Sequence, residues 1–173
     1  MTPPGLRIRP VRVEEATELA ALAARTFRDA FGPDNNPEDL QLHLATTYTP
    51  DRMREALQDP ECTSLFAEVD GVTVGYAQLF PRQPDPPLGD GARMLSRFYL
   101  EQGWLGQGIA PRLMDAVKED ARRRGARYLW LTVWQQNHRA SRFYEKCGFR
   151  TSGSTTFIVG NDPQTDWLML CPL

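Results

Sequence analysis

The residues best suited to chemistry form the run Leu105-Gly106-Gln107-Gly108-Ile109-Ala110-Pro111, between a strand-like apolar segment and an amphipathic one. Two glycines leave room for several main-chain N–H groups to point at one place. The helix expected after them adds its unpaired N–H groups and the positive end of its dipole. Such a strand, turn and helix start would seat a diphosphate. A tight turn that binds nothing has the same pattern, because short glycine motifs are weakly specific.

Three phosphate-binding designs use such a turn. A P-loop needs Lys and Ser or Thr after its last glycine, whereas Ile109-Ala110-Pro111 follows Gly108, so that design is excluded. A dinucleotide-binding fold needs an acid at the end of the next strand to hold the ribose. The next expected strand, 127–134, has no acid and ends in Gln135-Gln136-Asn137. The third design seats the pyrophosphate of coenzyme A, and it fits the rest of the C-terminal half.

The elements that must position this turn follow from periodicity and turn residues. In the C-terminal half we expect a strand over 92–100, a helix opened by Pro111 and closed by Gly125, a buried strand over 128–133, a helix capped by Asn137, and strands over 155–159 and 167–171. In the N-terminal half we expect a strand over 6–10, helices over 13–31, 37–48 and 50–58, and a hairpin of 64–69 and 72–80 around Asp70-Gly71.

Length and composition limit the class of protein. The 173 residues predict a single domain, 1–173, large enough to bury a core without metal or disulfide support. A net charge of −2 argues against a nucleic-acid partner, and Arg122-Arg123-Arg124 is typical of a solvated helix end. No apolar run approaches membrane-spanning length, so no membrane partner is expected.

The three cysteines, Cys62, Cys147 and Cys171, are far apart and lack metal-ligand spacing. With only two histidines in the chain, no metal site is expected. Unpaired thiols in this pattern predict a reducing, cytoplasmic location.

The order of elements, with Leu105–Ala110 and the later Asn137…Phe143-Tyr144-Glu145-Lys146-Cys147-Gly148-Phe149, resembles a GCN5-related N-acetyltransferase (GNAT). Gly108 and Ala110 fill the last two fixed positions of the family signature Arg/Gln-x-x-Gly-x-Gly/Ala, whereas Leu105 departs from its first. The resemblance implies an α/β three-layer fold, with a mixed, mostly antiparallel sheet of about seven strands and helices on both faces. Phe31-Gly32…Asn36-Pro37-Glu38-Asp39-Leu40 also resembles the PaiA-like polyamine acetyltransferases of this superfamily.

The resemblance implies acetyl-CoA as co-substrate and a set of residues that hold it. Phe98, Tyr99 and Leu100 would pair their main chain with the pantetheine arm. The pyrophosphate would lie on Leu105, Gly106, Gln107, Gly108, Ile109 and Ala110. Arg112 would meet a phosphate or stay in solvent. Asn137 would cap its helix and also contact the cofactor.

Tyr144 is the catalytic candidate that the resemblance implies. When an amine attacks an acetyl thioester, the leaving group is a thiolate, which a neutral phenol can protonate. A core tyrosine on a stripe with Ala140 and Cys147 is the alternative. For the general base, Glu101 and Glu68 are candidates, although each also fits a surface position.

The acceptor would be a primary amine. Four acids, Asp29, Asp34, Glu38 and Asp39, would attract a cationic amine such as a polyamine, although acids at a helix start also favour its dipole. A protein N-terminus or lysine, an amino acid and an antibiotic amine are other acceptors. A non-catalytic acyl-CoA-binding regulator and a dinucleotide-binding domain are the other functional classes, and family relatives suggest a homodimer by analogy.

Overall fold

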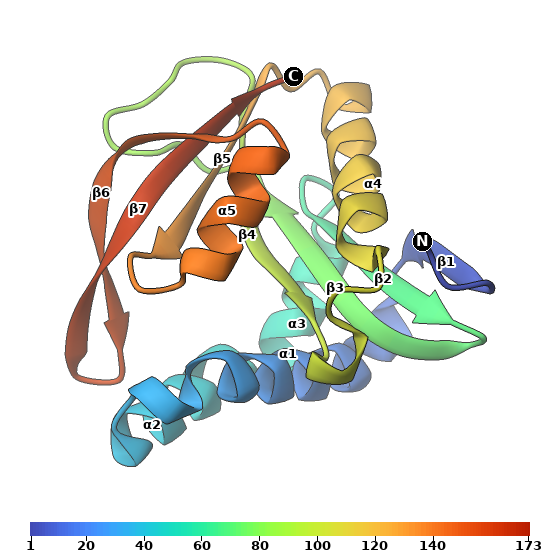
Figure 1. Cartoon of the computed structure of the whole chain (residues 1–173), viewed down its shortest axis with the longest axis horizontal. Helices are drawn as coiled ribbons and strands as arrows, with labels where there is room; N and C mark the ends of the chain where they lie inside the picture. The colour runs from blue at the N-terminus through green and yellow to red at the C-terminus, as the bar shows by residue number, and fades with distance from the viewer.

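Seven strands form one mixed sheet in the order β1-β2-β3-β4-β5-β7-β6 (Figure 1). The computed structural model describes all 173 residues except the side chain of Phe157. The strands are β1 (Leu6–Pro10), β2 (Thr63–Val69), β3 (Val72–Phe80), β4 (Ala92–Leu100), β5 (Tyr128–Trp134), β6 (Arg150–Val159) and β7 (Asp162–Pro172). All neighbours are antiparallel except β4 and β5. The predicted sheet is confirmed, and the parallel sheet of a dinucleotide-binding fold is excluded.

Helices cover both faces of this sheet (Figure 1). On one face lie α1 (Ala16–Phe31), α2 (Pro37–Thr47) and α3 (Pro50–Gln58), and on the other α4 (Ile109–Arg123) and α5 (His138–Lys146). Because successive strand residues point to opposite faces, Phe66 and Tyr76 join the core under α1, whereas Leu65 and Ala77 join the core under α4. Among the helices described, none is long and apolar enough to span a membrane.

Local signals in the sequence account for several boundaries. Asn36 caps α2, since its side chain accepts hydrogen bonds from the main-chain N–H groups of Glu38 and Asp39. Asp70 and Gly71, with φ of 50° and 83°, form the tight β2–β3 turn. The helix expected from Pro111 begins two residues earlier, at Ile109, which leaves the proline in the first turn, where its missing N–H costs no helical bond.

The structure corrects three other boundaries. The first turn of the helix expected over 13–31 is a 3-10 helix, Val13–Glu15, and α1 begins at Ala16. The last two strands, expected over 155–159 and 167–171, are about twice as long and pair from Arg150↔Leu170 to Val159↔Asp162. The tip of this hairpin lies against α2, where Asp39 Oδ1 accepts a hydrogen bond from Asn161 N at 3.1 Å. Tertiary contact therefore extends strands whose polar residues give no alternating pattern.

The parting of β4 from β5 creates the space for a site. The two strands pair only from Ala92↔Tyr128 to Met94↔Trp130. On the other edge of β4, Leu79 pairs with Leu95 and Gln78 with Arg97, so Ser96 is an extra residue in β4. A bulge of this kind bends a strand and increases its twist. From Ser96 to Leu100, the edge of β4 toward β5 has no strand partner within the described chain.

Candidate active site

A cavity of about 990 Å³ lies where β4 and β5 part. Its lining comes from both faces of the sheet, with Ala110 and Tyr144 on the α4–α5 side and Thr26, Phe27 and His43 on the α1–α2 side. The gap in the sheet therefore joins two half-sites. We call the part on the α4–α5 side the donor half and the part on the α1–α2 side the acceptor half.

Most of the residues predicted to bind coenzyme A line this cavity. They are Phe98, Tyr99, Leu100, Leu105, Gly106, Gly108, Ala110, Asn137 and Tyr144. Gln107 is exposed, and its amide donates to the carbonyl of Gly103 at 2.8 Å. Ile109 is fully buried in the core beneath the turn. Neither side chain lines the cavity, so Gln107 and Ile109 can contact a ligand there only through main-chain groups. Arg112 is exposed and outside the cavity lining.

The glycine turn leaves main-chain donors without partners. Gly106 and Gly108 have φ of 76° and 79°, a region that favours glycine. Within the described residues, the N–H groups of Gly106, Gln107 and Gly108 donate to no main-chain or side-chain atom, and no side chain caps α4. Unpaired N–H groups at a helix start attract an anion. The turn therefore fits the diphosphate that the sequence predicts for it.

A cationic face of α5 extends the donor half. Arg139, Arg142 and Lys146 line the cavity and are exposed. Their spacing of three and four residues places them on one side of the helix. Such a face suits an anionic ligand. This spacing, i, i+3 and i+7, can be read from the sequence once the helix is placed.

The unpaired edge of β4 is the third feature that fits the cofactor. Phe98, Tyr99 and Leu100 pair with β3 on one edge only, opposite Ala77, Tyr76 and Gly75. The other edge lines the cavity. An extended, amide-containing arm can add to such an edge through main-chain hydrogen bonds.

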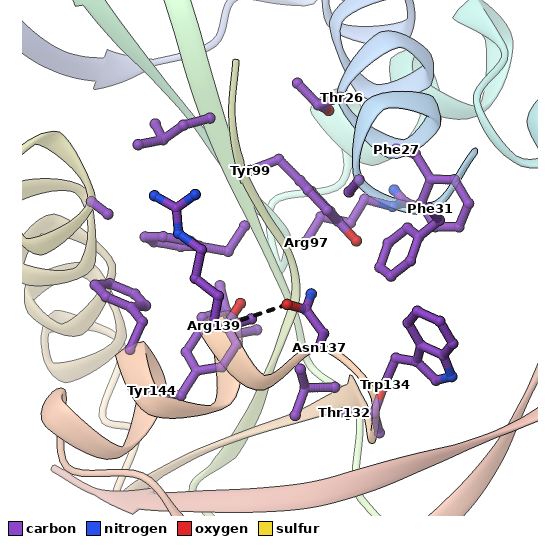
Figure 2. A pocket seen from close by; sticks show the side chains of 18 of the residues that line it. Thr26, Phe27, Phe31, Arg97, Tyr99, Thr132, Trp134, Asn137, Arg139 and Tyr144 are labelled. Atoms are coloured by element: carbon purple, nitrogen blue, oxygen red, sulfur yellow. Dashed lines mark hydrogen bonds between the residues drawn. The ribbon is translucent and has the colours of Figure 1, made fainter. Parts of the chain in front are cut away.

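Asn137 and Tyr144 stand beside the opening between the strands (Figure 2). The Oδ1 atom of Asn137 accepts a hydrogen bond from the N–H of Ala140 at 3.2 Å, which makes Asn137 the N-cap of α5 as predicted. Its amide NH₂ has no hydrogen-bond partner among the described residues and remains available to a ligand.

Tyr144 is held by aromatic neighbours. Its ring centroid lies 6.2 Å from that of Phe98, 5.5 Å from that of Phe143 and 5.7 Å from that of Phe149. Burial raises the pKa of the Tyr144 phenol above its ordinary value of 10, with a smaller effect from Cys147. The phenol is therefore neutral at physiological pH and can act as a proton donor.

The acids predicted from the sequence lie elsewhere, with one exception. Glu101 forms an ion pair with Arg25, and Glu68 forms one with Arg9 at 2.7 Å. Neither glutamate lines the cavity, so the structure favours neither as the base. Of the four acids proposed to attract an amine, Asp29 lines the cavity. The other three, Asp34, Glu38 and Asp39, do not.

Aromatic rings and one cation shape the acceptor half. The Phe31 ring lies 6.0 Å from Trp134 and 6.4 Å from Tyr99, centroid to centroid, and all three border the opening (Figure 2). Arg97 lies 5.2 Å over the Tyr48 ring and donates to Oε1 of Gln78 at 2.7 Å. No carboxylate pairs with it among the described side chains.

Asp166 is the titratable residue that the sequence reasoning missed. It lines the cavity from β7, opposite Trp134 in the register with β5, and only 5% of it is exposed. Its Oδ1 atom has no hydrogen-bond partner among the described atoms. Burial raises the pKa of this carboxyl to about 6, although a hydrogen bond with Thr132 partly opposes the shift.

No cluster of metal-ligating side chains occurs among the described residues.

Similarity to known proteins agrees with this geometry. The sequence model described as "Acetyltransferase (GNAT) family" matches residues 19–149. An uncharacterized N-acetyltransferase of Mycobacterium tuberculosis is 40% identical over 156 residues, 90% of this chain and 96% of that protein. The spermine/spermidine N(1)-acetyltransferase of Bacillus subtilis is 25% identical over 133 residues, 72% of this chain and 87% of that protein. A crystal structure of PaiA N-acetyltransferase from Thermoplasma acidophilum, in complex with coenzyme A, has a TM-score of 0.79 at 17% identity, covering 97% and 99% of the chains.

The glycine turn gives a first prediction. A Cβ at Gly106 meets no atom within 4 Å, so Gly106→Ala tests the backbone alone, where left-handed φ costs about 1–2 kcal/mol. We expect the turn to relax, its N–H groups to turn away, and the Kd for coenzyme A to rise about tenfold in calorimetry. Gly103→Ala, in the same loop with open space and no positive φ, is the matched control. Equal Kd values for the two variants would contradict this role of the turn.

The buried carboxyl gives a second prediction. Because the pKa of Asp166 is about 6 in the folded protein and about 3.8 ordinarily, the folded state binds more protons between these values. Stability contributed by this group is present below about pH 4 and is lost as pH rises through 6. We therefore expect the free energy of unfolding of Asp166→Asn, relative to that of the original chain, to increase by about 1–3 kcal/mol as the pH rises from 4 to 8. Denaturant unfolding measures this difference. A difference in the free energy of unfolding that does not change with pH would contradict this prediction.

Proposed function

Because the chain belongs to the acetyltransferase (GNAT) family, we propose that it transfers the acetyl group of acetyl-CoA to a primary amine by direct attack within a ternary complex. The observation that carries the proposal is the single cavity with a donor half and an acceptor half that meet between β4 and β5. Two substrates that enter from opposite faces of the sheet would meet beside Tyr144 and Asn137. Direct attack needs no nucleophilic residue of the protein.

The residues of the donor half have separate tasks in this proposal. The turn of residues 105–110 and the cationic face of α5 hold the phosphates, while the edge of β4 pairs with the pantetheine arm. Acetyl-CoA supplies an activated acyl group as its thioester. The amide NH₂ of Asn137 hydrogen-bonds the arm near its acyl end. These contacts fix the thioester at the gap, and such positioning lowers the barrier to attack.

Tyr144 acts as the general acid. As the carbon–sulfur bond breaks, the sulfur atom gains charge, and the neutral phenol donates its proton there. Burial among the rings of Phe98, Phe143 and Phe149 keeps the phenol neutral and excludes water from the thiolate.

A small amine fits the acceptor half better than a protein chain. The Phe31 and Trp134 rings, 6.0 Å apart centroid to centroid, line the acceptor side and offer aromatic faces to a small cation. Asp29 and Asp166 would attract a cation, and the similarity to the Bacillus subtilis spermine/spermidine N(1)-acetyltransferase supports a polyamine. Arg97, a guanidinium without an acidic partner in the described chain, supports a second class, amines that also carry a carboxylate such as amino acids.

Tyr144→Phe tests the general acid. We expect kcat to fall more than tenfold, because the thiolate would leave without a proton donor, while the Kd for acetyl-CoA stays within about twofold. Free-thiol release and calorimetry measure the two quantities. Tyr128→Phe, at a partly exposed tyrosine outside the cavity, is the matched control. An unchanged kcat at saturating substrates would remove Tyr144 from the mechanism.

An acceptor panel tests the reaction itself. Free-thiol release is followed with spermidine, an amino acid, an aminoglycoside and a peptide with a free N-terminus. We expect at least one small amine to react about ten times faster than the peptide, because aromatic rings and the Asp29 and Asp166 carboxylates that line the cavity suit a small cation. A faster peptide would favour a protein acetyltransferase. Thermal stabilisation by acetyl-CoA with no thiol release from any amine would favour a non-catalytic regulator.

A further inference from the structure

Burial of the Asp166 carboxylate costs free energy that hydrogen bonds within the protein do not fully offset. One oxygen of a carboxylate that is about 95% buried lacks a hydrogen-bond partner among the described residues. Buried polar groups are nearly always paired, and an unpaired one lowers stability by about 1–3 kcal/mol. Oδ1 itself is fully buried, but Asp166 lines the cavity, so a cation bound there can offset the charge of the carboxylate.

The residues around Asp166 indicate which chemical group would bind its carboxylate. Trp134 is directly opposite it in the β5–β7 register, so the two side chains share a face of the sheet about 5 Å apart at Cβ. The Trp134 ring contacts Phe31, and Thr132 hydrogen-bonds the carboxyl. A carboxylate beside aromatic faces binds an alkylammonium group, through an ion pair and cation–π contacts.

We propose that Asp166, with Trp134 and Phe31, forms the ammonium-binding subsite of the acceptor, and that its carboxylate takes the proton of that ammonium before attack. The inference rests on the proposed amine acetylation and adds to it the group that binds and deprotonates the acceptor. It replaces Glu101 and Glu68, whose carboxylates are paired with Arg25 and Arg9.

The proton balance of the reaction closes with these groups. A proton moves from the ammonium to the Asp166 carboxylate, and the lone pair of the resulting amine forms a bond to the acetyl carbon. The carbon–sulfur bond breaks, and the sulfur takes the phenol proton of Tyr144. The nitrogen, now bearing the acetyl group, gives its extra proton to the Tyr144 oxygen. Asp166 releases its proton to water, so one proton is released per turnover.

Burial makes the transfer feasible near neutral pH. It raises the pKa of the carboxyl to about 6 in the free protein, and it disfavours the charged forms of the carboxylate and of a bound ammonium alike, so proton transfer between them removes two buried charges. Other titratable or charged groups line the same cavity: Asp29 from α1, His43 and Tyr48 near α2, Arg82 after β3, Arg97 and Tyr99 from β4, and Arg139, Arg142, Tyr144 and Lys146 from α5. Of these, His43 has its pKa lowered from 6.5 by burial and by Arg97.

The test is the pH dependence of kcat/KM for n-butylamine, which carries only an ammonium group, and for the best acceptor of the panel. For the original chain we expect kcat/KM to rise with pH through an apparent pKa of about 6. Asp166→Asn should lower kcat/KM about 100-fold at pH 7 and remove this limb, leaving a rise that follows the unprotonated amine. The Kd for acetyl-CoA should stay within about twofold.

Matched variants separate this role from a structural one. Asp162→Asn, at an exposed acid of the same strand, should behave as the original chain. His43→Gln should keep the limb near pH 6, which assigns that limb to Asp166. Asp166→Glu should keep the limb with a lower kcat, and it decides the matter if Asp166→Asn does not fold.

The outcomes distinguish the two proposals. Thiol release by the original chain, with an unchanged kcat/KM and pH limb in Asp166→Asn, or a limb lost in Asp166→Glu, would overturn the role of Asp166 and leave amine acetylation standing. A limb lost only in His43→Gln would also overturn it. An original chain that acetylates no amine would overturn amine acetylation first.

Discussion

The parting of β4 from β5 is the constraint on which the site depends. Parallel pairing stops at Met94↔Trp130, and the extra residue Ser96 bends β4 away. The same event leaves a main-chain edge unpaired and opens a passage between the two faces of the sheet. An ordinary, fully paired sheet would separate the helices α4 and α5 from α1 and α2. Here the break opens one cavity that residues from both helical layers line.

The two halves of the cavity differ in the charges that line them. On the donor side, N–H groups of the glycine turn and the cations Arg139, Arg142 and Lys146 suit a highly anionic cofactor. On the acceptor side, aromatic rings surround a buried carboxylate, which suits a single cation. The Arg97 guanidinium also lines the acceptor side, so that side carries charges of both signs, whereas the donor side is cationic. The arrangement favours one orientation of each substrate.

The sequence predicts the donor half better than the acceptor half, for physical reasons. The glycine turn, the Asn137 cap and the buried stripe of α4 are local, so residue type and spacing are enough to locate them. The acceptor half is assembled by tertiary contact. Asp166 lies in the polar start of β7, just outside the strand predicted over 167–171, because no apolar alternation marks this part of the chain as a strand. Only pairing with β5 buries that carboxylate and turns it toward the cavity. The ion pairs that occupy Glu101 and Glu68 are equally non-local.

The chemistry of acetylation also bears on why a protein would keep a carboxylate buried without a partner. In the proposed reaction the acceptor enters as an ammonium ion, whose charge would offset that of the Asp166 carboxylate, which is without a full set of partners in the free protein. Acetylation converts that ammonium into a neutral amide, which forms no ion pair and makes weaker contacts with the aromatic rings. Substrate and product therefore differ most at the group that Asp166 would bind, and the reaction itself removes the interaction that held the acceptor. A better-solvated or permanently paired carboxylate would discriminate less between the two.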